Sequence, residues 1–300
     1  MAGQRLMMPA QIIRERRHYP FVIEALIAIV RTKPLGTFGG VLVLACGLCA
    51  AFAPWIAPYN YDTAVADVML SPRPGYWLGT DYGGRDLLSR VIYGSRVSIT
   101  VGFGAVALAS FLACILGVIT GYYGGMLDAL LQRVVDAFMS FPWLIIMMSI
   151  MAILGLTLTN LILGLGVLMT WANSRVVRSA VLSIKESQYI EAARAIGAGD
   201  LRIILQHILP NVFAPVIVIA TVLLGSAILT EASLSWLGLG VPPPNPTWGG
   251  MLSGPAMVHM HRAPWMVIFP GLALSTAVFG FNMLGDALRD VMDPRLRGTR

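Results

Sequence analysis

Few side chains of this 300-residue chain could carry out chemistry, because only 12% of its residues are charged. Its apolar runs contain no pair of Asp residues, no Ser–His pairing and no H-E-x-x-H pattern, so they offer no constellation for acid–base, nucleophilic or zinc-assisted catalysis. The sequence also lacks the pattern G-x-x-x-x-G-K-[ST], and we therefore expect the chain itself to bind no ATP. The polar residues that remain have to be considered one group at a time.

Glu231 is the one carboxylate deep inside a predicted apolar span. An ionisable residue in such a place is a functional hypothesis by default. Because Glu231 lies roughly twenty residues into its helix, we expect it near the external end of the span, where burying a charge is less costly. Two roles stay open: a structural hydrogen bond to loop backbone, which is favoured, and a contact with a substrate.

Two further polar groups lie in predicted external loops. Arg85, Asp86 and Arg90 fall between the first two spans, where they either hold the loop together through salt bridges or contact a partner protein. His259 and His261 lie in the last external loop, but two histidines at i and i+2 without a third ligand are a weak metal signal. We therefore predict no metal site.

A polar island between two long apolar runs is the most distinctive feature of the chain. It begins with Glu191-Ala192-Ala193 and Gly197, and it ends at Leu209-Pro210. Good helix formers predict one short helix over Tyr189–Ala198, and Asp200 is expected to cap a second, with Pro210 at the turn into the next span. The small residues would let a soluble partner approach closely, although an ordinary amphipathic loop is the alternative.

The elements that position these residues must be membrane-spanning helices. The chain is 57% hydrophobic, whereas charged residues make up about a quarter of a typical soluble domain. A helix needs about 20 apolar residues to cross a bilayer. The charge-free run Ala137–Ser174 would be ~57 Å long as one helix, so we divide it into two near Gly155–Asn160. Six spans result; the other four are Phe38–Ile56, Val97–Thr120, Asn211–Leu234 and Pro264–Leu284.

The distribution of basic residues predicts the orientation of these spans. Of the 21 Lys and Arg residues, 16 fall on the side of both termini, which the positive-inside rule assigns to the cytoplasm. The run Phe21–Val30 is too short to cross and is expected to lie in the membrane interface. The chain is thus divided into a cytoplasmic N-terminal segment (1–37), a six-span domain (38–284) and a cytoplasmic tail (285–300). Within the six-span domain we predict two external loops, 57–96 and 235–263, and one cytoplasmic loop, 175–210.

The polar island resembles the signature E-A-A-x-x-x-G-x₉-I-x-L-P of bacterial ABC importer permeases. Glu191, Ala192, Ala193, Gly197, Leu209 and Pro210 match it, and His207 stands where the signature has Ile. Residues 78–96, 230–233, 248–252 and 281–295 also look like the dipeptide/oligopeptide/nickel branch of that family, so the likeness covers most of residues 35–297. The chain is similar to the C-type permeases of that branch.

The resemblance implies an all-α membrane protein with six transmembrane helices, an N-terminal interfacial helix and the type I importer architecture. It implies a B-type permease partner, two cytoplasmic ATPases that bind ATP and Mg, and a periplasmic binding protein, with no cofactor on this chain. The signature residues would contact an ATPase. Arg85, Asp86 and Arg90 would face the binding protein or the second permease. The protein would lie in the bacterial inner membrane and would not be an enzyme.

The substrate stays open at this stage. Peptides are favoured by family resemblance alone, and nickel chelates, glutathione and opines are alternatives within the same class. A secondary carrier driven by an ion gradient, a membrane-embedded enzyme and a stand-alone channel are alternatives from other classes. The carrier would need charges or broken helices at the membrane midplane, and the predicted spans offer only Glu231.

Overall fold

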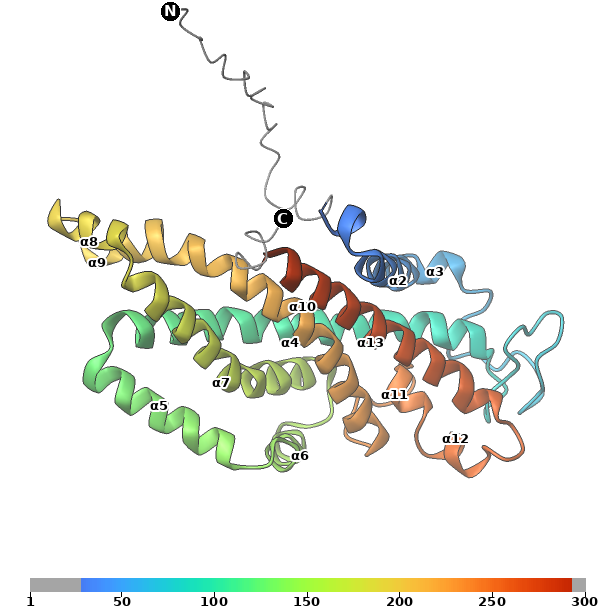
Figure 1. Ribbon diagram of the computed structural model, residues 1–300. Coiled ribbons are helices and arrows are strands. Elements are labelled where there is room, and N and C mark those ends of the chain that lie inside the picture. Colours follow the sequence, from blue (N-terminus) through green and yellow to red (C-terminus); the bar gives the residue numbers. More distant parts are fainter. Residues whose placement is uncertain (1–27, 293–300) are drawn as a thin grey trace, which may run out of the picture.

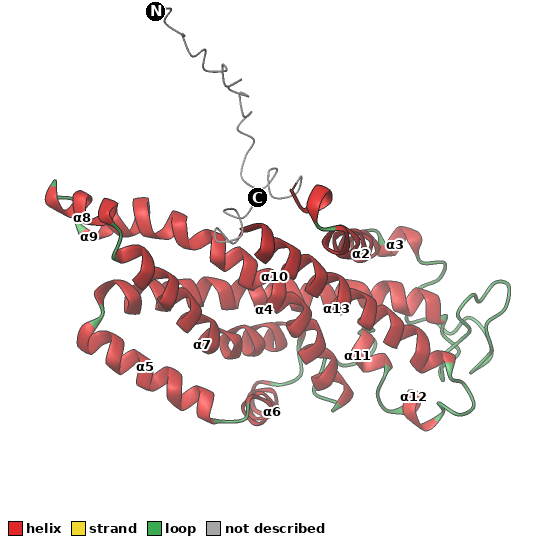
Figure 2. Cartoon of the chain, viewed as in Figure 1, coloured by secondary structure: helices red, strands yellow, loops and turns green. Residues whose placement is uncertain are grey.

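The computed structural model describes residues 28–292 and consists of helices joined by loops, with no β-strand among those residues (Figures 1 and 2). The predicted all-α class is therefore confirmed for this part of the chain. The predicted interfacial helix at Phe21–Val30 falls mostly outside the described residues. The elements are α2 (Pro34–Ala51), α3 (Ala53–Ile56), α4 (Leu87–Tyr123), α5 (Gly125–Ser140), α6 (Trp143–Leu154), α7 (Leu158–Lys185), α8 (Gln188–Ala195), α9 (Asp200–Ile203), the π-helix η1 (Ile204–Ile208), α10 (Leu209–Trp236), α11 (Trp248–Met251), α12 (Pro255–Val258) and α13 (Trp265–Met292).

Four helices among the described residues are long and apolar enough to cross a membrane by length and composition. They are α2, α4, α13 and the continuous helix Asp200–Trp236, which joins α9, η1 and α10. The pair α5 and α6 makes a fifth if the two are counted together. Helix α7 is long but less apolar, because Arg175, Arg178 and Lys185 lie in its second half. The count of six spans therefore stays a prediction.

The prediction that the third span is one continuous helix from Ala137 is wrong. The helix is interrupted between Ser140 and Trp143, and α5 and α6 meet there at an angle of 87°. Pro142 explains the break, because a proline inside a helix removes a hydrogen bond and its ring clashes with the preceding turn. The predicted joint near Gly155–Asn160 is confirmed. There, the Thr157 hydroxyl caps α7 by accepting a hydrogen bond from the Asn160 backbone N–H at 3.1 Å.

The ends of other elements also differ from the predicted boundaries. Helix α4 begins ten residues before the predicted Val97, because the Asp86 carboxylate caps its first turn by accepting a hydrogen bond from the Ser89 backbone N–H at 2.8 Å. The predicted external loop 57–96 therefore ends at residue 86. The predicted cytoplasmic loop 175–210 is mostly helical, since α7 runs to Lys185 and helix resumes at Asp200. Likewise, α13 continues to Met292, beyond the predicted start of the tail at residue 285.

Pro210 does not mark a turn, which corrects the prediction. It lies in the first turn of α10, and the helix that begins at Asp200 passes through it. Proline has no N–H to donate backwards along a helix, so it is tolerated only where that bond is not required. The wider π-helical turn η1 directly before it, where the Leu209 N–H donates to the Ile204 carbonyl, lets the helix continue into α10.

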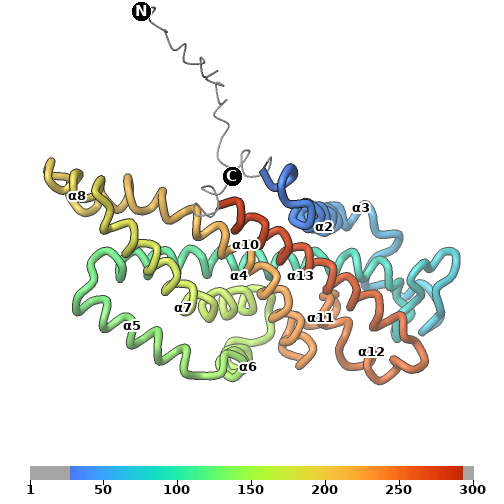
Figure 3. The backbone as a smooth tube through the Cα atoms, in the orientation of Figure 1, coloured from blue at the N-terminus to red at the C-terminus, as the bar shows by residue number. Residues whose placement is uncertain are grey.

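Helices α4 and α7 pack backbone against backbone. A side-chain carbon added at Gly117 would lie 2.6 Å from Cβ of Val177, and one at Gly121 would lie 2.8 Å from Cβ of Val181. Small residues allow this close approach between membrane helices. Near the other end of the pair, Gly104 faces Ile162. The residue numbers rise together along the contact, so α4 and α7 run parallel and α5 and α6 return the chain between them (Figure 3).

The glycine contact yields a stability prediction. Gly117→Leu should force α4 and α7 apart and lower the free energy of unfolding by about 1–3 kcal/mol, as overpacking of a close contact does. Gly47→Leu is the matched control, because a side chain at this helical glycine of α2 meets no atom within 4 Å. Thermal unfolding of the purified chain in detergent measures both. Equal midpoints for the two variants would contradict the packing argument.

Candidate functional site

The predicted docking segment forms α8 at one end of the helix bundle, opposite the 57–86 loop (Figure 2). Ile190 and Ala193 point inward, where they are buried against Val177 of α7 and Ile203 of α9 in one apolar cluster. This contact leaves the outward face of α8 exposed, with small or polar side chains, namely Glu191, Ala192 and Ala195. The alanines make this face flat, so another protein could approach the helix closely.

Gly197 ends α8 with a left-handed residue. Its φ is +85°, a conformation that glycine adopts without strain. The Ala198 N–H donates to the Ala193 carbonyl at 3.0 Å, and the Gly197 N–H donates to the Arg194 carbonyl at 2.9 Å. These two bonds form a Schellman cap, which satisfies carbonyls at the end of the helix. A side chain at Gly197 would meet no atom within 4 Å, so the local need for glycine is conformational.

Large apolar side chains surround the end of α8 and are exposed. Ile196 is 86% exposed and Leu201 is 70% exposed. Sequence analysis missed them because both lie within a segment that looked like a polar loop. We call Glu191, Ala192, Ala195, Ile196 and Leu201 the α8 surface. Large exposed apolar side chains beside a flat helix face favour an interaction site at this end of the bundle.

The remaining signature residues have different surroundings. Leu209 is half-buried against the apolar cluster beneath α8, and Pro210 is exposed. Leu209 therefore anchors the segment to the bundle, and its predicted contact with a partner stays a prediction. Asp200 does not cap α9, since Gly199 occupies the cap position. Instead, the Asp200 carboxylate accepts a hydrogen bond from the Tyr122 hydroxyl at 2.5 Å, a partner that no pattern in the sequence predicts.

Glu231 lies in a closed cage of hydroxyl groups near the other end of the bundle. It is fully buried, and its carboxylate accepts hydrogen bonds from Ser98 at 3.2 Å and Ser235 at 2.7 Å. The Trp248 backbone N–H donates to the Ser98 hydroxyl at 3.3 Å, so the cage joins α4, α10 and α11. The predicted hydrogen bond to loop backbone is thus replaced by bonds from side chains. This geometry favours the structural role, whereas the substrate contact stays a prediction.

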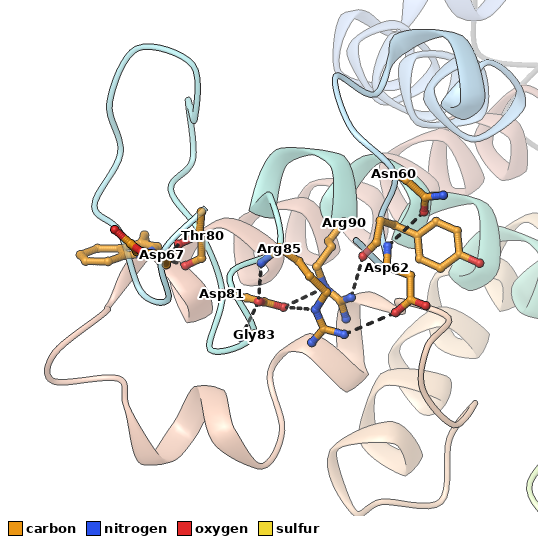
Figure 4. Close-up of polar contacts among 10 residues, drawn as sticks. Asn60, Asp62, Asp67, Thr80, Asp81, Gly83, Arg85 and Arg90 are labelled. Carbon is orange, nitrogen blue, oxygen red and sulfur yellow. Dashed lines mark hydrogen bonds and ion pairs between the residues drawn. The ribbon is translucent and has the colours of Figure 1, made fainter. Parts of the chain in front are cut away.

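Asp81, which sequence analysis overlooked, gathers the two arginines of the 57–86 loop region (Figure 4). Its carboxylate lies 2.8 Å from Nε of Arg85 and 3.3 Å from Nε of Arg90, and it is almost fully buried. It also accepts the Gly83 N–H at 2.7 Å, a local turn that the sequence Asp-Tyr-Gly-Gly could have suggested. Arg90 additionally donates to the Tyr61 carbonyl at 3.0 Å.

These contacts determine the roles that remain for the predicted loop residues. Asp86 is not part of the ion-pair network, because its carboxylate caps α4 through the Ser89 backbone N–H and hydroxyl. Arg90 lies inside α4 and not in the loop. Burial by itself lowers the pKa of Arg85, but the Asp81 carboxylate and Tyr82 raise it, so its pKa lies above the ordinary value and the guanidinium stays charged. The network holds the loop together, and contact with a partner stays a prediction.

A cavity of about 290 Å³ opens beside this network. Its lining includes Asp81, Arg90 and residues of the proline-rich segment, namely Pro242, Pro243, Asn245, Pro246 and Thr247. Ser235, which donates to Glu231, also lines it, whereas Glu231 itself does not. His259 and His261 follow α12 and are not among its lining residues. Among residues 28–292 no three His, Cys, Asp or Glu side chains gather in a metal-binding arrangement.

Comparison with known proteins decides the family. Residues 113–298, which contain α8, the cap glycine and Glu231, match the family described as binding-protein-dependent transport system inner membrane component. The chain belongs to this family. Residues 28–72 of the permease match the N-terminal transmembrane domain of oligopeptide transport permease C. It is therefore a multi-pass inner-membrane subunit of a transport system.

Three curated relatives show how far the similarity extends. The dipeptide transport system permease protein DppC of Alkalihalophilus pseudofirmus is 41% identical over 89% of this permease and 88% of its own length. The di/tripeptide transport system permease protein DppC of Pseudomonas aeruginosa is 40% identical over 88% of the permease and 89% of its own length. The glutathione transport system permease protein GsiD of Escherichia coli is 38% identical over 89% of both chains.

Glu231 can be tested by two substitutions. Glu231→Gln keeps a carbonyl acceptor for the serine hydroxyls, so the transport rate and substrate preference of the assembled system should stay within about twofold of wild type. Glu231→Leu leaves those buried hydroxyls without an acceptor and should lower the free energy of unfolding by about 1–3 kcal/mol. Transport assays and thermal unfolding measure the two effects. A changed substrate preference in Glu231→Gln would instead establish substrate contact.

The helix cap at Gly197 can be tested by substitution, with Gly199, two residues away, as the matched control. Gly197→Ala should destabilise the end of α8 by about 1 kcal/mol, because an L-residue is strained at positive φ. Gly199→Ala should have no such effect, since Gly199 has a φ of −72° and, like Gly197, open space around it. Hydrogen exchange of the amides in residues 188–195 should become about fivefold faster only in Gly197→Ala. Equal exchange in both variants would refute the cap.

Proposed function

We propose that this permease is one of two membrane subunits of an ATP-driven importer of short peptides. A B-type permease would complete the pathway, two ATPases would bind and hydrolyse ATP with Mg, and a periplasmic binding protein would deliver the peptide. The observation that carries the proposal is the 41% identity to a dipeptide permease over 89% of the chain. The relatives are named for dipeptides, di/tripeptides and glutathione. Dipeptides, tripeptides and glutathione all contain amide bonds and charged ends, which favours peptides over nickel chelates and opines as the substrate of this permease.

The parallel packing of α4 and α7 supports six membrane crossings. If α4 crosses the bilayer, α7 must cross it in the same direction, because the two stay in contact from Gly104 and Ile162 to Gly121 and Val181. The connecting pair α5–α6 must then cross in the opposite direction. Adding α2, α10 and α13 gives six crossings, as the family resemblance implies.

The charges at the two ends of the bundle support the predicted orientation. The end that carries α8 and α9 is rich in basic residues, and the positive-inside rule assigns such an end to the cytoplasm. The external end carries the Asp81 network and the cavity, where a binding protein would dock. The basic residues that α7, α8 and α9 contribute to this end are Arg175, Arg178, Lys185, Arg194 and Arg202.

The break between α5 and α6 supports a place for the pathway. Irregular backbone at membrane depth is tolerated only where it is buried in protein or lines a water-filled space. Ser140, Phe141 and Pro142 are exposed in the isolated chain, so a second permease or an aqueous pathway should cover them. The inner part of this face is polar, since Arg178 Nε lies 2.7 Å from Asp128 and Arg175 pairs with Asp136.

The α8 surface is the proposed contact with an ATPase. Its exposed Ile196 and Leu201 provide apolar area, and the flat Ala192 permits close approach. Closure of the ATPases on ATP would push α8, and rigid-body rocking of the two permeases would open the pathway outward. A secondary carrier is less well supported, because Glu231 is enclosed by hydroxyl groups and does not itself line the cavity.

Reconstitution in lipid vesicles tests this function. The complete set of subunits should take up a labelled dipeptide only with ATP, and this chain alone should show neither uptake nor ATP hydrolysis. Ala192→Arg places a bulky charge on the α8 surface and should reduce the amount of ATPase that co-purifies with the permease by at least about tenfold. The small control Ala192→Ser should leave that amount unchanged. Uptake by this chain alone, driven by an ion gradient, would refute the proposal.

A further inference from the structure

Tyr122 ties the last turn of α4 to the segment that carries the α8 surface. It is only 4% exposed, and its hydroxyl donates to the Asp200 carboxylate of α9 at 2.5 Å, across 78 positions of sequence. The shortness of this bond is typical of a hydroxyl that donates to a charged oxygen, which is stronger than a bond between neutral groups. Neither the family signature nor the charge pattern singles out Tyr122.

Two cations complete the surroundings of this tyrosine. The guanidinium carbon of Arg194 in α8 and Nζ of Lys185 in α7 each lie 5.7 Å from the centre of the Tyr122 ring. Cations at this distance are attracted by the ring. Lys185 also donates to the Tyr122 backbone carbonyl. One side chain of α4 therefore contacts the end of α7, α8 and α9 together.

Helix α8 needs such an anchor because apolar contact alone does not fix its direction. It has eight residues, far below the length at which a helix is stable by itself, whereas α9 begins the long helix that continues through η1 into α10. The buried residues of α8 are Ile190 and Ala193, and apolar contacts are non-directional. The hydrogen bond from Tyr122 to Asp200 is directional, so it fixes the start of the long helix, against which α8 packs, relative to α4.

We propose that Tyr122 is the positioning residue through which a displacement of α8 reaches α4. This inference rests on the proposed function, in which an ATPase moves α8. Helix α4 contacts α7 through Gly117 and Gly121, and it contacts α10 through Gly102, which faces Ile228. Near its first turn, Leu87 and Arg90 line the external cavity. A movement of the inner end of α4 would therefore displace the whole bundle. The tyrosine couples α8 to the element with the widest contacts.

Tyr122→Phe isolates the proposed role. It removes the hydroxyl and keeps the ring that packs in the apolar cluster and attracts the cations. The adjacent Tyr123 is the matched control, because it is 54% exposed and Tyr123→Phe removes the same atom. The complete transporter with Tyr122→Phe should assemble and hydrolyse ATP but import about tenfold fewer labelled dipeptides per ATP, as loss of a hydrogen bond to a charged group predicts. Tyr123→Phe should match wild type.

The acceptor side gives an independent check. Asp200→Ala should lower the number of peptides imported per ATP as much as Tyr122→Phe, and the double variant should be no worse than either, because both remove one bond. Asp200→Asn retains an oxygen acceptor and should restore most of the coupling. Additive losses in the double variant would overturn the proposal, since the two residues would then act separately.

A second measurement requires no substrate. In the purified chain, Tyr122→Phe should speed hydrogen exchange of the amides in residues 188–203 about tenfold, whereas Tyr123→Phe should leave it unchanged. Lack of dipeptide uptake by the wild-type transporter would count against the proposed function, and the exchange result would then decide the role of Tyr122. Wild-type exchange in Tyr122→Phe, or wild-type coupling, would overturn the proposal.

Discussion

Gly117 and Gly121 bring the backbones of α4 and α7 into direct contact, and the rest of the structure depends on this parallel pair. In a membrane there is no hydrophobic gain in pressing one apolar helix against another, so association depends on close packing and polar contacts. Only residues without a side chain allow this approach at Val177 and Val181. The contact fixes the direction of both helices and obliges α5 and α6 to return the chain between them.

The same pair supports both ends of the molecule. At the end that carries α8, α4 and α7 provide the apolar cluster on which Ile190 and Ala193 of α8 lie, together with Tyr122, which reaches α9. At the other end, Asp86 caps α4, and Arg90 in its first turn joins the Asp81 network. The proposed contact with an ATPase and the cavity are thus attached to one continuous helix of 37 residues. A long helix of this kind can transmit a rigid-body movement, because the protein interior around it is close-packed and hardly compressible.

Two buried carboxylates of this permease, Glu231 and Asp81, each have a partner from another element. Glu231 has hydroxyl partners from α4 and α10, and Asp81 has arginine partners from the loop and from α4. Each arrangement follows from the cost of leaving a charge or a hydroxyl without a partner away from water. These groups therefore join separate elements, and they hold the end of the bundle together around the cavity.

The sequence by itself determined the membrane environment, the approximate position of most spans, the joint at Gly155 and the location of the α8 surface. These follow from composition, length and helix-breaking residues, which act locally. The early start of α4, the bend at Pro142 and the helix through Pro210 were decided by caps, ring clashes and a π-turn that hydropathy does not detect. The contacts of Tyr122 with Asp200, of Glu231 with Ser98 and of Asp81 with Arg90 were decided only by tertiary structure. Each of them joins residues from different elements, and no local pattern in the chain specifies that distance.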